Sequence, residues 1–207
     1  MTKYVLALIT ILAGCGGSAP QVRYYQLASP AAGARGPGGA VLAVEPLAAE
    51  GAYDDDRIVY RVDPVRLDYY DYHHWSATPG AMVGAYLEQA FAGTGKFRSV
   101  VRATTTETAA VLGGRVIAIE EIDESKTRWV GHIAVELTLT DPKSGATVWS
   151  HAYDEREPLA AQTQEGLARA IGAAMDRIVR AATPEIADLA ERQARARGLI
   201  APTVAGE

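Results

Sequence analysis

A segment in which an apolar residue or glycine stands at every second position, WVGHIAVELTLTDP at 129–142, limits the fold more than any other part of the chain. Every second residue from Trp129 to Leu139 is apolar or glycine. This period of two predicts a β-strand with one side in the core and the other in solvent. The residues on the solvent side are His132, Glu136, Thr138 and Thr140. β-rich segments lie before it at 109–122 and after it at 146–156, so we expect a three-stranded antiparallel meander with one wet face.

Two segments have the period of an amphipathic helix. The first begins at Thr78, a good N-cap residue, with Pro79 in the first helical position. Its apolar stripe consists of Val83, Tyr86, Leu87, Ala90 and Phe91. The stripe of the second helix consists of Leu167, Ile171, Ala174, Met175, Ile178 and Val179. A helix start signal recurs at Thr183 and Pro184, so we expect residues 183–207 to be a separate projecting helix or tail.

The first third of the chain also contains strand signals, at 22–27, 40–47, 56–64 and 66–72. With 207 residues, of which 48% are hydrophobic, the chain is long enough to bury one core. We therefore predict a single α+β domain over 22–182, with a mixed β-sheet, a late antiparallel meander and two main helices packed on one face. A net charge of −5 with scattered lysines and arginines argues against nucleic-acid binding.

The first fifteen residues have the layout of an exported lipoprotein. An apolar run at 4–11 is too short to cross a bilayer, because a span needs about 20 apolar residues. The string LAGC, which ends at Cys15, resembles the bacterial lipobox, in which the peptide is cut before the cysteine and the cysteine is acylated. We expect 1–14 to be a signal peptide, Cys15 to carry diacylglycerol and an N-acyl chain, and 15–21 to be a tether. Gly16, in place of an aspartate, favours the outer membrane.

Residues 66–80, RLDYYDYHHWSATPG, contain acids and two histidines, but their pattern does not favour a metal or catalytic site. His73 and His74 are adjacent, so on a strand their side chains point to opposite faces, and the H-E-x-x-H spacing of a zinc site is absent. There is no G-x-S-x-G elbow, and the only cysteine, Cys15, is assigned to lipid. We expect no catalytic residues, no metal and no cofactor besides the covalent lipid.

Tyrosine, tryptophan and arginine are concentrated between 53 and 75. These residue types anchor protein interfaces because they bury a large area and keep a polar end. The candidate interface residues are Tyr53, Arg57, Tyr60, Arg61, Tyr70, Tyr72 and Trp75. The alternative is that these rings fill the core beside the first helix. The sequence leaves both uses open.

The order of the motifs resembles that of the ABC-type transport auxiliary lipoproteins, including paraquat-inducible protein C-like proteins. The resemblance covers residues 24 to about 182 and is carried, after the lipobox, by YYQLASP, VLAVEPL, YDDDRIVYR, YYDYHHWSATPG and GTGKF. It implies a non-catalytic lipoprotein at the outer membrane, facing the periplasm. The implied partners are a permease, its ATPase and a periplasm-spanning mammalian-cell-entry (MCE) protein, which together move phospholipids between membranes. The resemblance is also compatible with a homo-oligomer of this chain.

The main alternative function is a stand-alone envelope lipoprotein that carries lipid in its own pocket. A structural envelope lipoprotein without a transport partner is a second alternative. Bound phospholipid in the isolated domain would favour the carrier, whereas association with an MCE protein would favour the auxiliary subunit.

Overall fold

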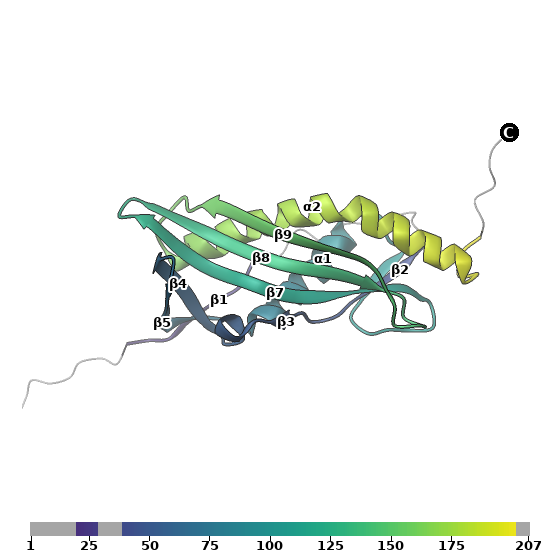
Figure 1. Cartoon of the computed structure of the whole chain (residues 1–207), viewed down its shortest axis with the longest axis horizontal. Helices are drawn as coiled ribbons and strands as arrows, with labels where there is room; N and C mark the ends of the chain where they lie inside the picture. Colours follow the sequence, from purple (N-terminus) through teal and green to yellow (C-terminus); the bar gives the residue numbers. More distant parts are fainter. Residues whose placement is uncertain (1–19, 29–38, 202–207) are drawn as a thin grey trace, which may run out of the picture.

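The computed structural model describes residues 20–28 and 39–201, which form one α+β domain (Figure 1). Cys15 and most of the expected tether lie outside these residues. The strands are β1 (Arg23–Tyr25), β2 (Val41–Val44), β3 (Ala48–Ala49), β4 (Arg57–Asp63), β5 (Arg66–Trp75), β6 (Ser99–Val101), β7 (Thr108–Ser125), β8 (Arg128–Thr140) and β9 (Thr147–Pro158). The helices are the 3-10 turn η1 (Gly51–Tyr53), α1 (Pro79–Gly93) and α2 (Gln164–Ala196). The α+β prediction is confirmed.

Strand β7 organises the sheet because each of its two edges has a different set of partners. One edge pairs antiparallel with β8, and β8 pairs antiparallel with β9, which confirms the predicted meander. The other edge pairs in succession with the short parallel strands β2, β3 and β4. The remaining neighbours give the order β1-β5-β4-β7-β2-β6. The long meander strands and the short early strands therefore form one mixed sheet (Figure 1).

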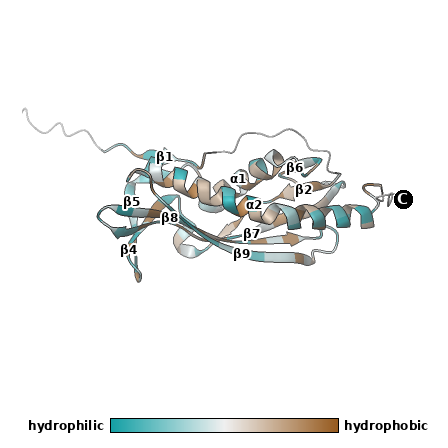
Figure 2. Ribbon diagram, turned by 90° about the horizontal axis from the view of Figure 1, so that it is seen from above, coloured by the Kyte–Doolittle hydropathy of each residue, from teal (hydrophilic) through white to brown (hydrophobic). Residues whose placement is uncertain are grey.

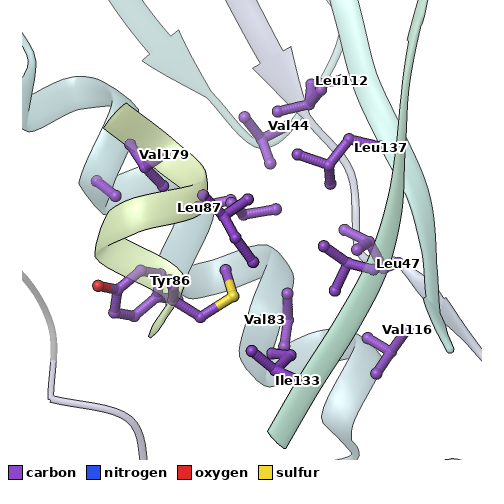
Figure 3. Close-up of a cluster of buried hydrophobic side chains, with 14 of the residues drawn as sticks. Val44, Leu47, Val83, Tyr86, Leu87, Leu112, Val116, Ile133, Leu137 and Val179 are labelled. Carbon is purple, nitrogen blue, oxygen red and sulfur yellow. The ribbon is translucent and has the colours of Figure 1, made fainter. Parts of the chain in front are cut away.

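Both α-helices cover the same side of the sheet, as predicted (Figure 2). Leu87 of α1 and Val179 of α2 lie among side chains of β2, β7 and β8 such as Leu137 (Figure 3). The Tyr86 hydroxyl on α1 joins the two helices by donating to Asp176 Oδ1 at 2.5 Å. The core therefore lies between the helix pair and the meander.

Helix α1 begins at Pro79, after Thr78, as its sequence signals predict. The Thr78 side chain, however, makes no capping hydrogen bond within the described chain. The residue after Pro79 is Gly80, and the close approach of Leu47 explains why it has no side chain. A Cβ on Gly80 would lie 2.0 Å from the Leu47 carbonyl oxygen, and the Leu47 N–H donates to the Gly80 carbonyl at 3.1 Å. Glycine thus lets the start of α1 approach the segment after β2.

The expected helix start at Thr183 is wrong, because α2 continues from Gln164 to Ala196 as one helix. Its N-cap is Thr163, whose Oγ1 accepts from the Gly166 N–H at 3.1 Å. Thr183 is buried and its hydroxyl donates back to the Val179 carbonyl at 2.6 Å, a local bond that is common inside helices. Pro184 lacks the N–H that would continue the hydrogen-bond ladder.

Tertiary packing holds the last part of α2 despite this proline. Ile186, Ala190 and Ala194 are fully buried. Beyond the helix, Arg197 Nη1 donates to the Thr108 carbonyl at 2.6 Å. The described residues after 183 therefore pack on the domain and do not project from it.

The expected wet face of the meander is partly wrong at His132. This residue is only 7% exposed, although it alternates with the core residues of β8. Its register partner on β7 is Glu120, to which Tyr53 of η1 and Arg61 of β4 donate hydrogen bonds. The η1 turn and the β4–β5 hairpin thus cover this end of the face, which period-two alternation alone does not predict.

Candidate docking site at the β4–β5 hairpin

The structure does not bring all seven candidate interface residues to one surface. Tyr53 and Trp75 are buried, and Trp75 lies in the hydrophobic core at 1% exposure. Four others are half-buried: Arg57, Tyr60, Arg61 and Tyr70. Tyr72 is exposed, with 45% of its surface accessible. The aromatic segment is therefore divided between the interior and the surface.

The two histidines of this segment diverge, as their adjacency predicts. His73 Nδ1 lies 2.8 Å from the Tyr25 hydroxyl, whereas His74 Nδ1 lies 3.0 Å from Asp56 Oδ1. Within residues 20–28 and 39–201, no group of three or more histidines, cysteines or acids is placed to hold a metal ion. Nor does any described helix have the length and apolarity to span a membrane.

A buried ionic cluster lies beneath the hairpin and is centred on Glu120. Glu120 Oε2 accepts from the Tyr53 hydroxyl at 2.8 Å and from Arg61 Nη2 at 3.1 Å. Glu120 Oε1 lies 3.0 Å from Nδ1 of His132, and Nε2 of the same ring lies 3.1 Å from Asp154 Oδ1. The two ring nitrogens of His132 thus each contact a carboxylate, one on β7 and one on β9. The cluster ties η1 and β4 to the meander.

The donors around Glu120 outweigh its burial. Burial alone would raise its pKa, but hydrogen bonds from His132, Arg61 and Tyr53 hold the pKa below its usual value. Burial and the bond to this carboxylate raise the pKa of Tyr53 to about 12. Glu120 is therefore a charged group fully paired within the protein, an arrangement that supports the hairpin.

A second carboxylate cluster lies on the opposite side of β7. Glu121 is completely buried, and its Oε1 accepts from the Tyr70 hydroxyl at 2.6 Å. The Tyr70 ring in turn packs against Tyr60, with ring centroids 4.6 Å apart. Burial first, and then the charge of the nearby Asp123, raise the pKa of Glu121 to about 7. Tyr60 and Tyr70 thus cover a carboxyl group that is protonated more readily than an ordinary glutamate.

The tip of the hairpin is apolar and exposed, in contrast to this polar support. Arg61 Nη1 donates to the Pro64 carbonyl at 2.7 Å, which fixes the turn. Val65 is 93% exposed and Val62 is 49% exposed. Beside the tip, a cleft of about 610 Å³ opens toward β7 and β8, with Glu120, His132 and Arg156 among its lining residues. Two valines held out over a charged cleft make the tip a candidate docking element.

Sequence reasoning missed the two valines, Glu120 and His132. Val65 carried a signal, because an apolar residue in the short connection between two strands has no core to fill. Glu120 and His132 carried none, since each reads as an ordinary strand residue until the hairpin is placed over them.

These observations define a single α+β domain with an apolar hairpin tip supported by a buried ion cluster. Residues 25–183 match the family model described as "ABC-type transport auxiliary lipoprotein component", and the chain belongs to that family. Its description as a transport auxiliary component denotes an accessory role in transport by a lipoprotein.

Solved structures share this fold. The crystal structure of protein XCC0632 from Xanthomonas campestris has a TM-score of 0.67 and 18% identity, over 84% of this chain and 99% of that chain. A crystal structure of an uncharacterized protein has a TM-score of 0.64 and 14% identity, over 80% of this chain and 99% of that chain. At these identities the likeness concerns the fold. The search of curated proteins found no match.

Proposed function

We propose that this protein is the outer-membrane-anchored, periplasm-facing auxiliary subunit of an MCE-type ABC lipid transporter. The family match over residues 25–183, which lies directly downstream of the LAGC string, carries the proposal. In this role the subunit is non-catalytic: it docks the periplasm-spanning MCE protein while the permease and ATPase at the inner membrane supply the work. Phospholipid transport between the membranes is the process that it supports.

We assign the docking contact to the hairpin tip. Val62, near the end of β4, and Val65, in the turn, are exposed apolar side chains beside Arg61, which binds the Pro64 carbonyl and Glu120. A preorganised apolar contact binds with little ordering cost. The other candidate residues lie away from the tip. Arg57 and Tyr72 reach the surface near the far end of β5, and five residues hold the hairpin in place: Tyr53, Tyr60, Arg61, Tyr70 and Trp75.

The carrier alternative has less support from the geometry. The cleft beside the tip is lined by Arg61, Asp63, Glu124 and Arg156 among others, and such charged walls suit headgroups better than acyl chains. Native mass spectrometry of the mature protein tests this alternative. Reproducible bound phospholipid would favour a carrier, and a protein free of lipid would favour docking.

The anchoring part of the proposal is tested by Cys15→Ala. Without the thiol, the precursor is neither acylated nor cut at the lipobox, so we expect unprocessed protein and loss of the outer-membrane fraction in sucrose-gradient fractionation. The MCE protein should no longer co-purify with outer membranes through this subunit. A matched control is Ser18→Ala, which leaves the lipobox cysteine intact. Normal processing and fractionation of the Cys15→Ala protein would contradict lipid anchoring.

A further inference from the structure

A small exposed patch lies on the pair of strands nearest the proposed anchor. Val22 is 45%, Tyr24 65% and Tyr72 45% exposed. Strand β1 pairs in parallel with β5, with Tyr24 opposite His74, and the Tyr24 and His74 ring centroids are 5.8 Å apart. Partners in a parallel pair point to the same side, and so do residues two apart on a strand. Tyr24 and His74 therefore lie on one side of the β1–β5 pair, and the exposed Val22 and Tyr72 each precede one of them by two residues.

The chain length places this patch near the anchor. Val22 is the seventh residue after Cys15, and an extended chain spans at most about 3.6 Å per residue, or about 25 Å in total. Strand β1 lies at the end of the domain where β4 and β5 are found (Figure 1). A lipid on Cys15 would thus hold the β1–β5 pair within this distance of the bilayer surface, whatever path the tether takes.

The chemistry of the patch suits a lipid headgroup layer. Tyrosine has an apolar ring and a polar end, which is why it is enriched at membrane interfaces. The group packed beside Tyr24 is His74, whose Nδ1 lies 3.0 Å from the carboxylate of Asp56, so the patch carries no excess of positive charge. It therefore does not have the basic character that selects anionic lipids.

We propose that Val22, Tyr24 and Tyr72 form a second, non-covalent membrane contact, which lays the β1–β5 edge on a zwitterionic lipid surface. This inference rests on the proposed lipidation of Cys15. It separates two functions of β5 along its length: the patch lies near its His74 end, and the docking tip lies beyond its Arg66 end, which is at most about 26 Å from His74 at the usual rise of a strand. The contact fixes the direction in which the tip is presented.

The test uses the mature chain with a single myristoyl chain coupled to the thiol of Cys15, the only cysteine. One such chain gives only marginal membrane binding, so any additional contact becomes measurable. Co-sedimentation with vesicles of phosphatidylcholine and phosphatidylethanolamine gives the partition coefficient. We expect Tyr24→Ser with Tyr72→Ser to lower it about tenfold. Val148→Ser, at an exposed valine of β9, should leave it unchanged. The thermal unfolding of all variants should match that of the unsubstituted protein.

Equal partitioning of the double variant and the unsubstituted protein would overturn the proposal. Binding that requires anionic lipid and ignores the tyrosines would also overturn it. If the double variant instead lowers the molecular mass in solution without changing partitioning, the patch joins copies of this chain and the lipid assignment is wrong. Because the acyl chain is attached chemically, these results do not depend on lipidation in the cell, which the Cys15→Ala experiment tests separately.

Discussion

Glu120 and Glu121 are neighbours on β7, but their side chains lie in two different regions of the molecule. Glu120 faces η1 and the β4 side, where three residues donate to it, and its pKa is lowered. Glu121 faces the side near the start of α2, where Tyr70 donates one hydrogen bond, and its pKa is raised to about 7. Burial is nearly complete for both. The number of donors therefore decides which buried carboxylate stays charged.

This difference has a structural consequence for the hairpin. The charged Glu120 binds η1 and β4 to the meander through ion pairs and hydrogen bonds, and it leaves the apolar tip free. The cluster around Glu121 is covered by rings and tolerates a proton. The first region thus supports the hairpin tip, and the second lowers the stability of the fold above neutral pH.

The largest effect is expected from Glu120→Gln. The substitution leaves Arg61 and His132 without the carboxylate that pairs with them, and breaking a buried pair costs about 3 kcal/mol of unfolding free energy at pH 7. A group whose folded pKa is lowered stabilises the fold above its unfolded pKa of 4.5, and it loses this contribution as the pH falls toward the lowered folded pKa. Urea unfolding of both proteins should therefore differ most near neutral pH and converge in acid. A constant difference down to acidic pH would show that charge is not the cause.

An effect of opposite sign and comparable size is expected from Glu121→Gln. A folded pKa raised from 4.5 to about 7 means that ionisation destabilises the fold progressively between these values and by a constant amount above them. Glutamine removes this cost, and its amide can accept from Tyr70 while donating to Asp123. We expect a stabilisation of about 3 kcal/mol at pH 8 and little change at pH 4, because a rise of the pKa from 4.5 to about 7 corresponds to this free energy. If Glu121→Gln instead destabilises the protein at pH 8, the charge of Glu121 stabilises the fold, as that of Glu120 does, and the proposed difference between the two carboxylates is wrong.

The smallest of these effects on stability is expected from Tyr70→Phe. The ring remains over Glu121, but the one hydrogen bond to this carboxylate is lost. A bond to a charged acceptor is worth more than one to a neutral acceptor, so the loss should be about 2 kcal/mol at pH 8 and about 1 kcal/mol at pH 4. Guanidinium unfolding at the two pH values measures the difference. An effect that is larger in acid would mean that the hydroxyl interacts with the protonated form.

Local patterns predicted the meander and the start of α1, because alternation and the Thr78-Pro79 pair act over short distances. They failed where a distant partner decides the outcome. Alternation alone does not reveal that β7 pairs with three short strands along one edge, nor that Ile186 and Ala190 hold α2 together beyond Pro184.

The candidate site was predicted only in part, for the same reason. Tyr53 and Arg61 were selected for their residue types, but their common partner Glu120 lies 67 and 59 positions away. Their role beneath the surface depends on that contact. Trp75 is of a residue type that often anchors interfaces, but it lies in the hydrophobic core.

The central claim is that the hairpin tip docks a transporter partner while its buried cluster serves only as support. Co-purification of the MCE protein with Val65→Asp tests this claim most directly. Val148→Asp is the matched control, and neither change should cost more than about 0.5 kcal/mol of stability, because both valines are exposed. We expect Val65→Asp to retain the native melting temperature and to lower MCE recovery at least tenfold, and Val148→Asp to recover the normal amount. Full recovery of the MCE protein with a folded Val65→Asp protein would contradict the claim.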